Sequence, residues 1–261
     1  MARNNHLHNF VYIVVNSRDR YVLSSGYDFA DFTHCLQEPL NNLLLLKHHY
    51  QNPAFHYVTQ MDYIPKENVN DLLQSETYKT GHFCWVDFED IFNLDTLEGQ
   101  ELAELLFLGH TKRHLTPPFY QELNNQFAYL TEQDGVLNRT YYKNWNDFYT
   151  ILGGVLVKKL AEVRPERSWL PFQKKKSYPR VPATILHQLS TVLTEGVVFS
   201  FAMAKIERGT AEIPFWVVGD FYDIDDMVET FQQEVEKPAT GRLVFDKKQR
   251  EWNAILTNSF E

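Results

Sequence analysis

The chain is poor in cysteine and glycine, and each shortage removes a class of protein from consideration. Its two cysteines, Cys35 and Cys84, are too few for the disulfide framework of a small secreted protein. Its 11 glycines form neither a phosphate-binding P-loop nor a dinucleotide-binding pattern. No serine lies in the G-x-S-x-G elbow of the common serine hydrolases. The compact motifs of nucleotide-dependent enzymes and serine hydrolases are therefore missing.

Long hydrophobic runs and an excess of positive charge are also missing. The longest aliphatic run is the four leucines at 43–46, whereas a membrane helix needs about 20 apolar residues. The N-terminal stretch MARNNHLHNF has no apolar region of the kind found in a secretory signal. The net charge is −9, and a nucleic-acid-binding protein normally carries a basic surface. These features predict a soluble cytoplasmic protein that binds neither membranes nor nucleic acid.

Aromatic residues, in contrast, are plentiful. They make up 15% of the chain, with 44% hydrophobic and 23% charged residues overall, which is typical of a folded globular protein. Large aromatic side chains favour strands and well-packed cores. A chain of 261 residues can form one large domain or two smaller ones.

An Asp-Phe pair followed by an apolar residue three positions after the Phe occurs at four spaced sites, and a further pair, Asp31-Phe32, overlaps the first. The aspartates are 59, 60 and 73 residues apart in order along the chain: Asp28, Asp87, Asp147 and Asp220. Aspartate is a preferred helix N-cap because its carboxylate accepts the free N–H groups of the first turn. The pattern predicts a joint between a strand and a capped helix at each site. The nearly equal first two intervals indicate an internal repeat, the alternative being several independent joints in one α+β protein.

Paired apolar segments separated by turn residues precede these sites. The strongest hairpin signal is Asp134-Gly135, which lies between two alternating segments. A helix, or a turn followed by a helix, is predicted at 39–50, and further helices at 95–114 and in a short segment from Pro117. The fold prediction is α+β, with repeated β-hairpin–helix units and antiparallel sheets covered by helices.

A basic segment interrupts this pattern. Residues 158–180 contain eight Lys or Arg against two Glu, together with three prolines. We predict an N-terminal part with three hairpin-helix units at 1–162, a basic linker or loop at 163–181, and a C-terminal part at 182–261. The segment is either a solvated linker or a docking surface for an acidic protein or for a second copy of this acidic chain. The candidate contact residues are Arg164, Arg167, Lys174, Lys175, Lys176 and Arg180.

Two groups of residues are candidates for a metal site. His110 and His114 are four apart, so on a helix they could share a zinc ion, but Thr111 stands where a zinc protease has its glutamate. Asp220 and Asp223 belong to an acidic cluster without the ligand order of an EF-hand. Helix-end electrostatics and helix capping explain both groups without a metal.

A third combination, of the two cysteines with His34 and His82, lacks the close cysteine spacing of zinc sites. No cofactor is therefore predicted, with zinc or another divalent metal as the alternative. The sequence favours a non-catalytic protein-binding or regulatory protein, and whether it is an enzyme is left open. The alternative function is a metal-dependent hydrolase that uses the histidines or acids named above.

Overall fold

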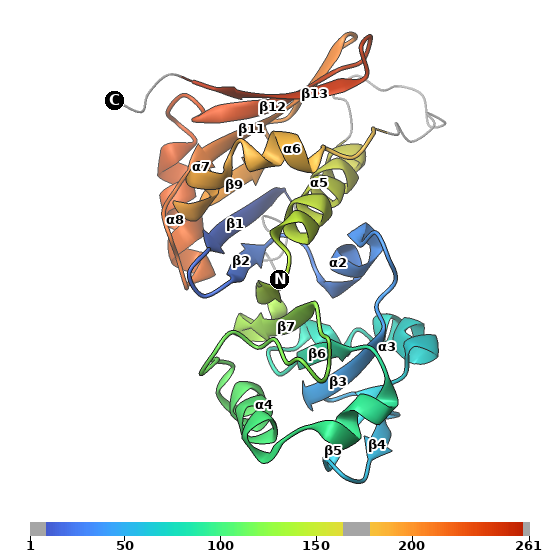
Figure 1. Cartoon of the computed structure of the whole chain (residues 1–261). Coiled ribbons are helices and arrows are strands. Elements are labelled where there is room, and N and C mark those ends of the chain that lie inside the picture. The colour runs from blue at the N-terminus through green and yellow to red at the C-terminus, as the bar shows by residue number, and fades with distance from the viewer. Residues whose placement is uncertain (1–8, 164–177, 258–261) are drawn as a thin grey trace. The chain divides into compact units, whose positions relative to one another are not determined.

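The computed structural model describes residues 9–163 and 178–257 (Figure 1). All of its paired strands for which a register is defined are antiparallel, and helices cover the sheets, which confirms the predicted α+β class. The chain divides into two compact units. Unit 1 comprises residues 1–15, 25–27 and 146–261, and unit 2 comprises residues 16–24 and 28–145.

The sheet of unit 1 has the strand order β13-β12-β11-β9-β1, and β10 adds to β11. Val11, Phe199 and Phe215 lie side by side across β1, β9 and β11, and all three are fully buried. The strands are β1 (Phe10–Asn16), β9 (Val197–Ser200), β10 (Lys205–Ile206), β11 (Thr210–Val217), β12 (Gly241–Asp246) and β13 (Glu251–Leu256).

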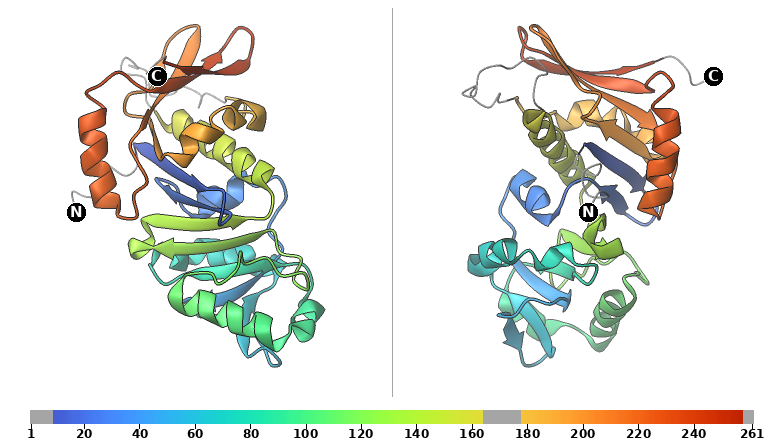
Figure 2. Two further views of the ribbon diagram at one scale, coloured as in Figure 1. Left: turned by 60° about the vertical axis from the view of Figure 1, so that its left-hand side comes forward. Right: turned by 180° about the vertical axis from the view of Figure 1, so that it is seen from behind.

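Helices cover both faces of this sheet, as Figure 2 shows. One face carries α5 (Trp145–Glu162), α6 (Ala183–His187) and α7 (Ser190–Thr194), and the other carries α8 (Ile224–Glu234). Phe231 of α8 packs against Phe10 and Trp216, with ring centroids 6.0 and 5.8 Å apart. The unit is thus a sheet between two helical layers. No described helix is long and apolar enough to cross a membrane.

The sheet of unit 2 has the strand order β2-β8-β7-β6-β3-β5-β4. Its strand β3 (Asn42–Lys47) corrects the predicted helix at 39–50. The leucines at 43–45 are almost completely buried, and they pair with residues 62–64 on one side and 85–87 on the other. Strands buried on both faces have continuous apolar sequences that resemble buried helices. The strands are β2 (Tyr21–Ser25), β3 (Asn42–Lys47), β4 (Ala54–His56), β5 (Met61–Ile64), β6 (Cys84–Phe88), β7 (Phe127–Glu132) and β8 (Leu137–Tyr142).

An aromatic cluster holds α2 (Phe29–Cys35) against the sheet of unit 2. The Phe29 ring lies 5.3 Å from Trp85 and 5.1 Å from Tyr129, while Phe32 lies 5.4 Å from Tyr129. Tilted contacts at these distances add stabilisation beyond the area that they bury. The other helices of this unit are α3 (Val69–Ser75) and α4 (Gly99–Thr111), together with the 3₁₀ turns η1 (Lys66–Asn68), η2 (Thr77–Lys79), η3 (Ile91–Thr96) and η4 (Gln133–Gly135).

One of the four Asp-Phe sites has the predicted capped helix. The Asp28 carboxylate accepts the Asp31 N–H at 2.9 Å, and the Asp31 carboxylate accepts the Asp28 N–H at 3.4 Å. This reciprocal pair is a capping box, which satisfies two of the free donors at the start of α2.

The predicted caps at the other three sites are wrong. Asp87 lies inside β6, and Asp147 lies in the first turn of α5, which has already begun at Trp145. Asp220 lies in a loop held by the hydroxyl of Tyr12, which donates to Gly219 O and accepts the N–H of Phe221. The helix that follows begins later, where Asp223 is the cap. The four sites have different local structures, so they show no repeated unit.

Two helix boundaries also differ from prediction. The helix predicted at 95–114 begins only at Gly99, because Ile91–Thr96 form the 3₁₀ helix η3 capped by Asp90. The helix predicted from Pro117 is a turn, in which the Asn125 side chain accepts the Tyr120 N–H and donates to Pro118 O, both at 2.8 Å. A side chain that satisfies backbone groups in this way competes with helix formation.

Candidate functional site

The two histidines proposed as a metal pair do not share a helix. His110 is exposed near the end of α4, whereas Lys112 takes a left-handed conformation with φ of 54° and terminates that helix. His114 therefore lies outside it, where its Nδ1 lies 2.8 Å from the hydroxyl of Tyr141. A spacing of four residues brings two side chains to the same face only within a helix, so it does not bring His110 and His114 together.

The acidic candidates serve the start of α8. Asp223 caps the helix by accepting the N–H of Asp225 at 2.8 Å, and Asp220 is exposed in the preceding loop. Desolvation raises the pKa of the Asp220 carboxyl above its usual value. Within residues 9–163 and 178–257, no group of three or more His, Cys, Asp or Glu side chains could hold a metal ion.

The cysteines are both buried free thiols. Burial raises the pKa of Cys84 to about 12, so its thiol is protonated at neutral pH. A protonated thiol is a poor nucleophile and a poor metal ligand. Both cysteines therefore behave as small core residues.

The basic segment falls largely outside the part of the chain that the structure describes, including Arg164, Arg167 and Lys174–Lys176. Arg180 is described and exposed, but its neighbour Val181 is fully buried. The Val181 N–H lies 3.4 Å from Gly153 O of α5, so this end of the predicted linker packs onto unit 1.

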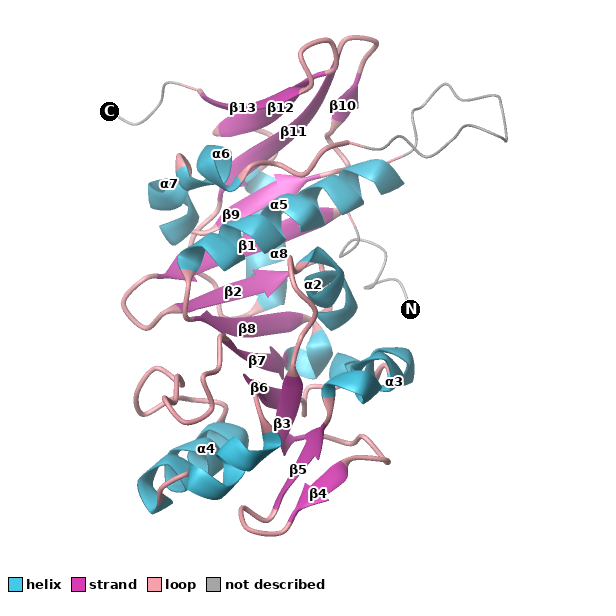
Figure 3. Cartoon of the chain, turned by 45° about the vertical axis from the view of Figure 1, so that its right-hand side comes forward, coloured by secondary structure: helices cyan, strands magenta, loops and turns pink. Residues whose placement is uncertain are grey.

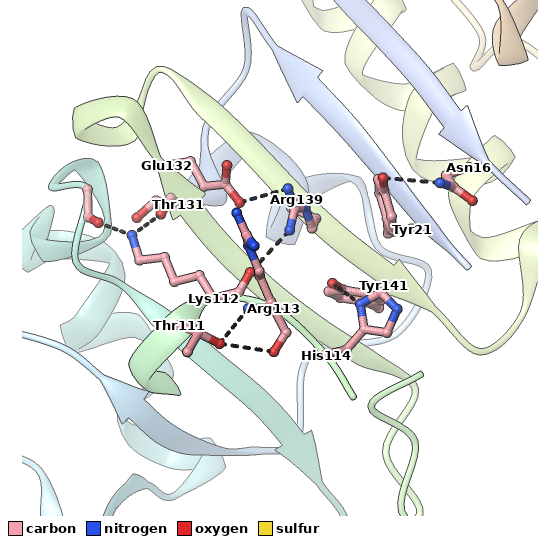
Figure 4. A network of polar contacts seen from close by, with 11 residues as sticks. Asn16, Tyr21, Thr111, Lys112, Arg113, His114, Thr131, Glu132, Arg139 and Tyr141 are labelled. Atoms are coloured by element: carbon pink, nitrogen blue, oxygen red, sulfur yellow. Dashed lines mark hydrogen bonds and ion pairs between the residues drawn. The ribbon is translucent and has the colours of Figure 1, made fainter. Parts of the chain in front are cut away.

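A network of polar side chains in unit 2 includes His114, which lies beside Tyr141 (Figure 4). The Nε2 atom of His114 lies 3.9 Å from the Asp19 carboxylate, and its Nδ1 contacts the Tyr141 hydroxyl. Burial lowers the pKa of His114, partly offset by Asp19, and burial raises the pKa of Tyr141. An Asp-His-Tyr series can relay a proton, but Tyr141 is fully buried and its hydroxyl is closed to a substrate.

The same network ties the segment after α4 to the sheet. Arg139 of β8 forms an ion pair with Glu132 at 3.2 Å and donates to Lys112 O at 3.1 Å. Its guanidinium also lies 5.0 Å from the ring centroid of Tyr21. Lys112 donates to Gly81 O and Thr131 O. These contacts of Arg139, Glu132 and Lys112 fix the segment after α4 against the sheet.

A concave site in unit 1 offers different chemistry. A cavity of about 370 Å³ lies where the β10–β11 and β12–β13 turns meet residues 178–179 (Figure 3 shows these strands). The strand register brings the turns together, because Thr210 pairs with Asp246 and the Lys247 N–H donates to Gly209 O at 2.9 Å. Its lining residues are Tyr178, Pro179, Glu207, Arg208, Phe245, Lys247 and Arg250. We call it the basic pocket.

Aromatic residues support one wall of the basic pocket. Tyr178 and Phe245 meet edge to face, with centroids 5.7 Å apart, and Trp252 packs on Phe245 at 5.2 Å. The Trp252 indole donates to Pro179 O at 2.9 Å, which holds residues 178–179 in place. The Tyr178 hydroxyl is buried and makes no hydrogen bond to any residue that the structure describes. This wall is rigid, because its rings are buried against one another.

Positive charge dominates the rest of the pocket lining. Arg208 and Arg250 are exposed, and within the described residues neither guanidinium takes part in an ion pair. Lys247 donates to Glu207 O. The nearby Asp246 carboxylate accepts the Lys248 and Gln249 N–H groups, which lower its pKa. Hydrogen bonding within the turn thus occupies the Asp246 carboxylate, and among the described residues no carboxylate, that of Glu207 included, forms an ion pair with either arginine.

Sequence reasoning missed Arg208, Lys247 and Arg250. Arg208 lies in the β10–β11 turn, and Lys247 and Arg250 lie in the β12–β13 turn. In the sequence 39 residues separate Arg208 from Lys247, and only the pairing of β11 with β12 brings the turns together. A basic residue in each of two turns was the available signal. No protein-family model matches the chain, and neither a curated protein nor a solved structure is significantly similar to it.

Proposed function

We propose that this protein is a non-catalytic binding protein that recognises an acidic segment of a protein partner through the basic pocket. The observation that carries the proposal is the pair of arginines at a concave site, Arg208 and Arg250, without an ion-pair partner among the described residues. The chain as a whole has a net charge of −9, so most of its surface repels an acidic partner. A local basic site would select where such a partner docks.

The lining chemistry favours a peptide segment over a lone ion. Arginine binds carboxylates through two parallel hydrogen bonds, which supply direction as well as charge. The wall formed by Tyr178 and Phe245 offers apolar surface for a hydrophobic side chain between the acidic ones. A volume of about 370 Å³ lies within the usual range of ligand sites.

The same lining supports binding rather than catalysis. Among the described residues that border the pocket there is no serine, cysteine or histidine. Covalent catalysis needs an activated nucleophile, and acid–base catalysis needs a group that can exchange a proton near neutral pH. Arginine stays charged and Phe245 is inert, while the Lys247 ammonium donates to Glu207 O. The lining therefore favours holding a ligand over transforming it.

Fluorescence anisotropy tests the proposal with a labelled peptide of ten glutamates around one central phenylalanine. We expect saturable binding that weakens as salt is added. The double reversal Arg208→Glu with Arg250→Glu should weaken it by roughly tenfold or more, because like charges then face the peptide. Arg242→Glu is the matched control, since it reverses an exposed arginine of β12 that does not line the pocket.

Two further probes sharpen the result. A peptide of ten lysines around the same phenylalanine should not bind, and inorganic phosphate should compete only at much higher concentration than the acidic peptide. Equal binding by the double reversal and by the Arg242→Glu control would overturn the proposal. Equal competition by phosphate would reduce the pocket to a general anion site.

A further inference from the structure

The strand β13 forms an open edge of the sheet in unit 1. The Thr257 N–H donates to Thr240 O at 2.9 Å just beyond its end. Hydrogen-bonded and non-hydrogen-bonded pairs alternate along an antiparallel ladder. The register of β13 with β12 therefore directs the backbone N–H and C=O groups of Trp252, Ala254 and Leu256 away from β12. These groups have no strand partner among the described residues.

This edge lacks the features that usually prevent strands from associating. Its sequence, EWNAIL, contains no proline or lysine, and its register with β12 has no bulge. Ile255 and Leu256 remain 41% and 42% exposed. The edge strand β4 of the sheet in unit 2 is only three residues long, and short edge strands resist pairing. The two edges differ in their capacity to accept another strand.

We infer that β13 pairs with β13 of a second copy of this chain, antiparallel about a two-fold axis at Ala254. In this register Trp252 lies opposite Leu256 of the other copy, and both use their outward backbone groups. Glu251, the only charged residue of the strand, lies opposite Thr257 and not opposite its own equivalent. An aromatic residue opposite an aliphatic one stabilises a sheet, and like charges opposite each other destabilise it.

The self-complementarity of this strand is the reason to choose a second copy. A two-fold axis places identical segments against each other, and alanine at the axis brings two small side chains together. The pairing covers the β13 edge of each copy with the β13 edge of the other, so it predicts a dimer and not a filament. This dimer does not depend on a ligand in the basic pocket.

Sedimentation velocity across a concentration series tests the inference. The unaltered protein should form dimers, and Ala254→Pro should be monomeric because proline removes an outward N–H at the axis. The ladder with β12 does not use that N–H, so the fold should survive, as thermal unfolding can check. Ala254→Ser keeps the N–H and is the matched control, which should remain dimeric.

Cysteine cross-linking tests the register. Ala254→Cys should give a disulfide-linked dimer under mild oxidation, because its Cα lies about 5.5 Å from its equivalent in a hydrogen-bonded pair, within disulfide range. Asn253→Cys should not, because its equivalent lies about 8 Å away after a shift of two residues. The native cysteines are buried and should not interfere. A protein that is monomeric at all concentrations, or a dimer that persists in Ala254→Pro, would contradict the inference.

Discussion

Asp28 and Asp87 both precede a phenylalanine, yet their carboxylates have opposite environments. Asp28 caps α2 from a half-buried position and shares hydrogen bonds with Asp31. Asp87 is 4% exposed and accepts the N–H groups of Gln126 and Phe127 at 3.0 and 2.6 Å. The first carboxylate organises a helix start, and the second organises the beginning of a neighbouring strand.

The capping role of Asp28 can be measured by substitution. Asp28→Ala should destabilise the protein by about 0.5–2 kcal/mol, the usual loss for an N-cap. Asp220→Ala is the matched control and should change stability by less than about 0.5 kcal/mol, because that exposed side chain caps no helix. Chemical denaturation of both variants checks this, and similar losses for the two would remove the special role of Asp28.

Asp87 should make stability depend on pH. Burial raises its pKa from the usual 3.8 to about 7, although the backbone hydrogen bonds act in the opposite direction. The folded state then binds a proton more tightly than the unfolded state, so this residue lowers stability as pH rises from about 4 to 7. Asp87→Asn should remove that decline, because asparagine cannot ionise and still offers an acceptor oxygen. Urea denaturation at several pH values tests this, and an unchanged slope in the variant would contradict it.

At the scale of single elements, α4 shows how packing overrides local preference. Gly99 begins this helix with open space around it, while Gly109 lies close to β3. A Cβ added at Gly109 would approach the backbone oxygen of Leu46 to 2.7 Å and its Cβ to 2.8 Å. Real Cβ atoms do not tolerate such distances, so the absence of a side chain at Gly109 sets how closely the helix lies on the sheet.

The two glycines should therefore respond to alanine with opposite sign. Helix propensity alone favours alanine by up to about 1 kcal/mol at either position. Gly99→Ala should be neutral or stabilising by that amount, whereas Gly109→Ala should destabilise by about 1–3 kcal/mol through overpacking. Thermal unfolding of the two variants provides the comparison. A stabilising effect at both positions would show that α4 can move away from β3 without cost.

The elements that could be predicted from sequence are those specified by local chemistry. The hairpin at 127–142 follows from Asp134-Gly135, and both residues adopt the positive φ expected there, 55° and 80°. The strand β3 could not be predicted, because its leucines are compatible with a buried helix until the neighbouring strands are known. The helix cap is Asp223 and not the predicted Asp220. The loop that contains Asp220 is held by the hydroxyl of Tyr12, a residue distant in the sequence.

At the scale of the whole molecule, charge is distributed unevenly along the chain. The sequence shows an acidic protein with one basic segment at 158–180, most of which lies outside the described residues. It does not show that Arg208 and Arg250, 42 residues apart, line one pocket. That juxtaposition depends on long-range strand pairing, which residue spacing does not encode. The partner, the localisation and the division at 163–181 stay predictions.

The most direct test of acidic-partner recognition is a titration of isotope-labelled protein with the glutamate–phenylalanine peptide, followed by amide NMR shifts. The proposed function predicts that the largest shift changes cluster in the two turns that border the basic pocket, at 207–209 and 245–250. Arg208→Glu with Arg250→Glu should abolish those changes while leaving the rest of the spectrum folded. Shift changes centred elsewhere, or none at saturating peptide, would contradict the proposed function.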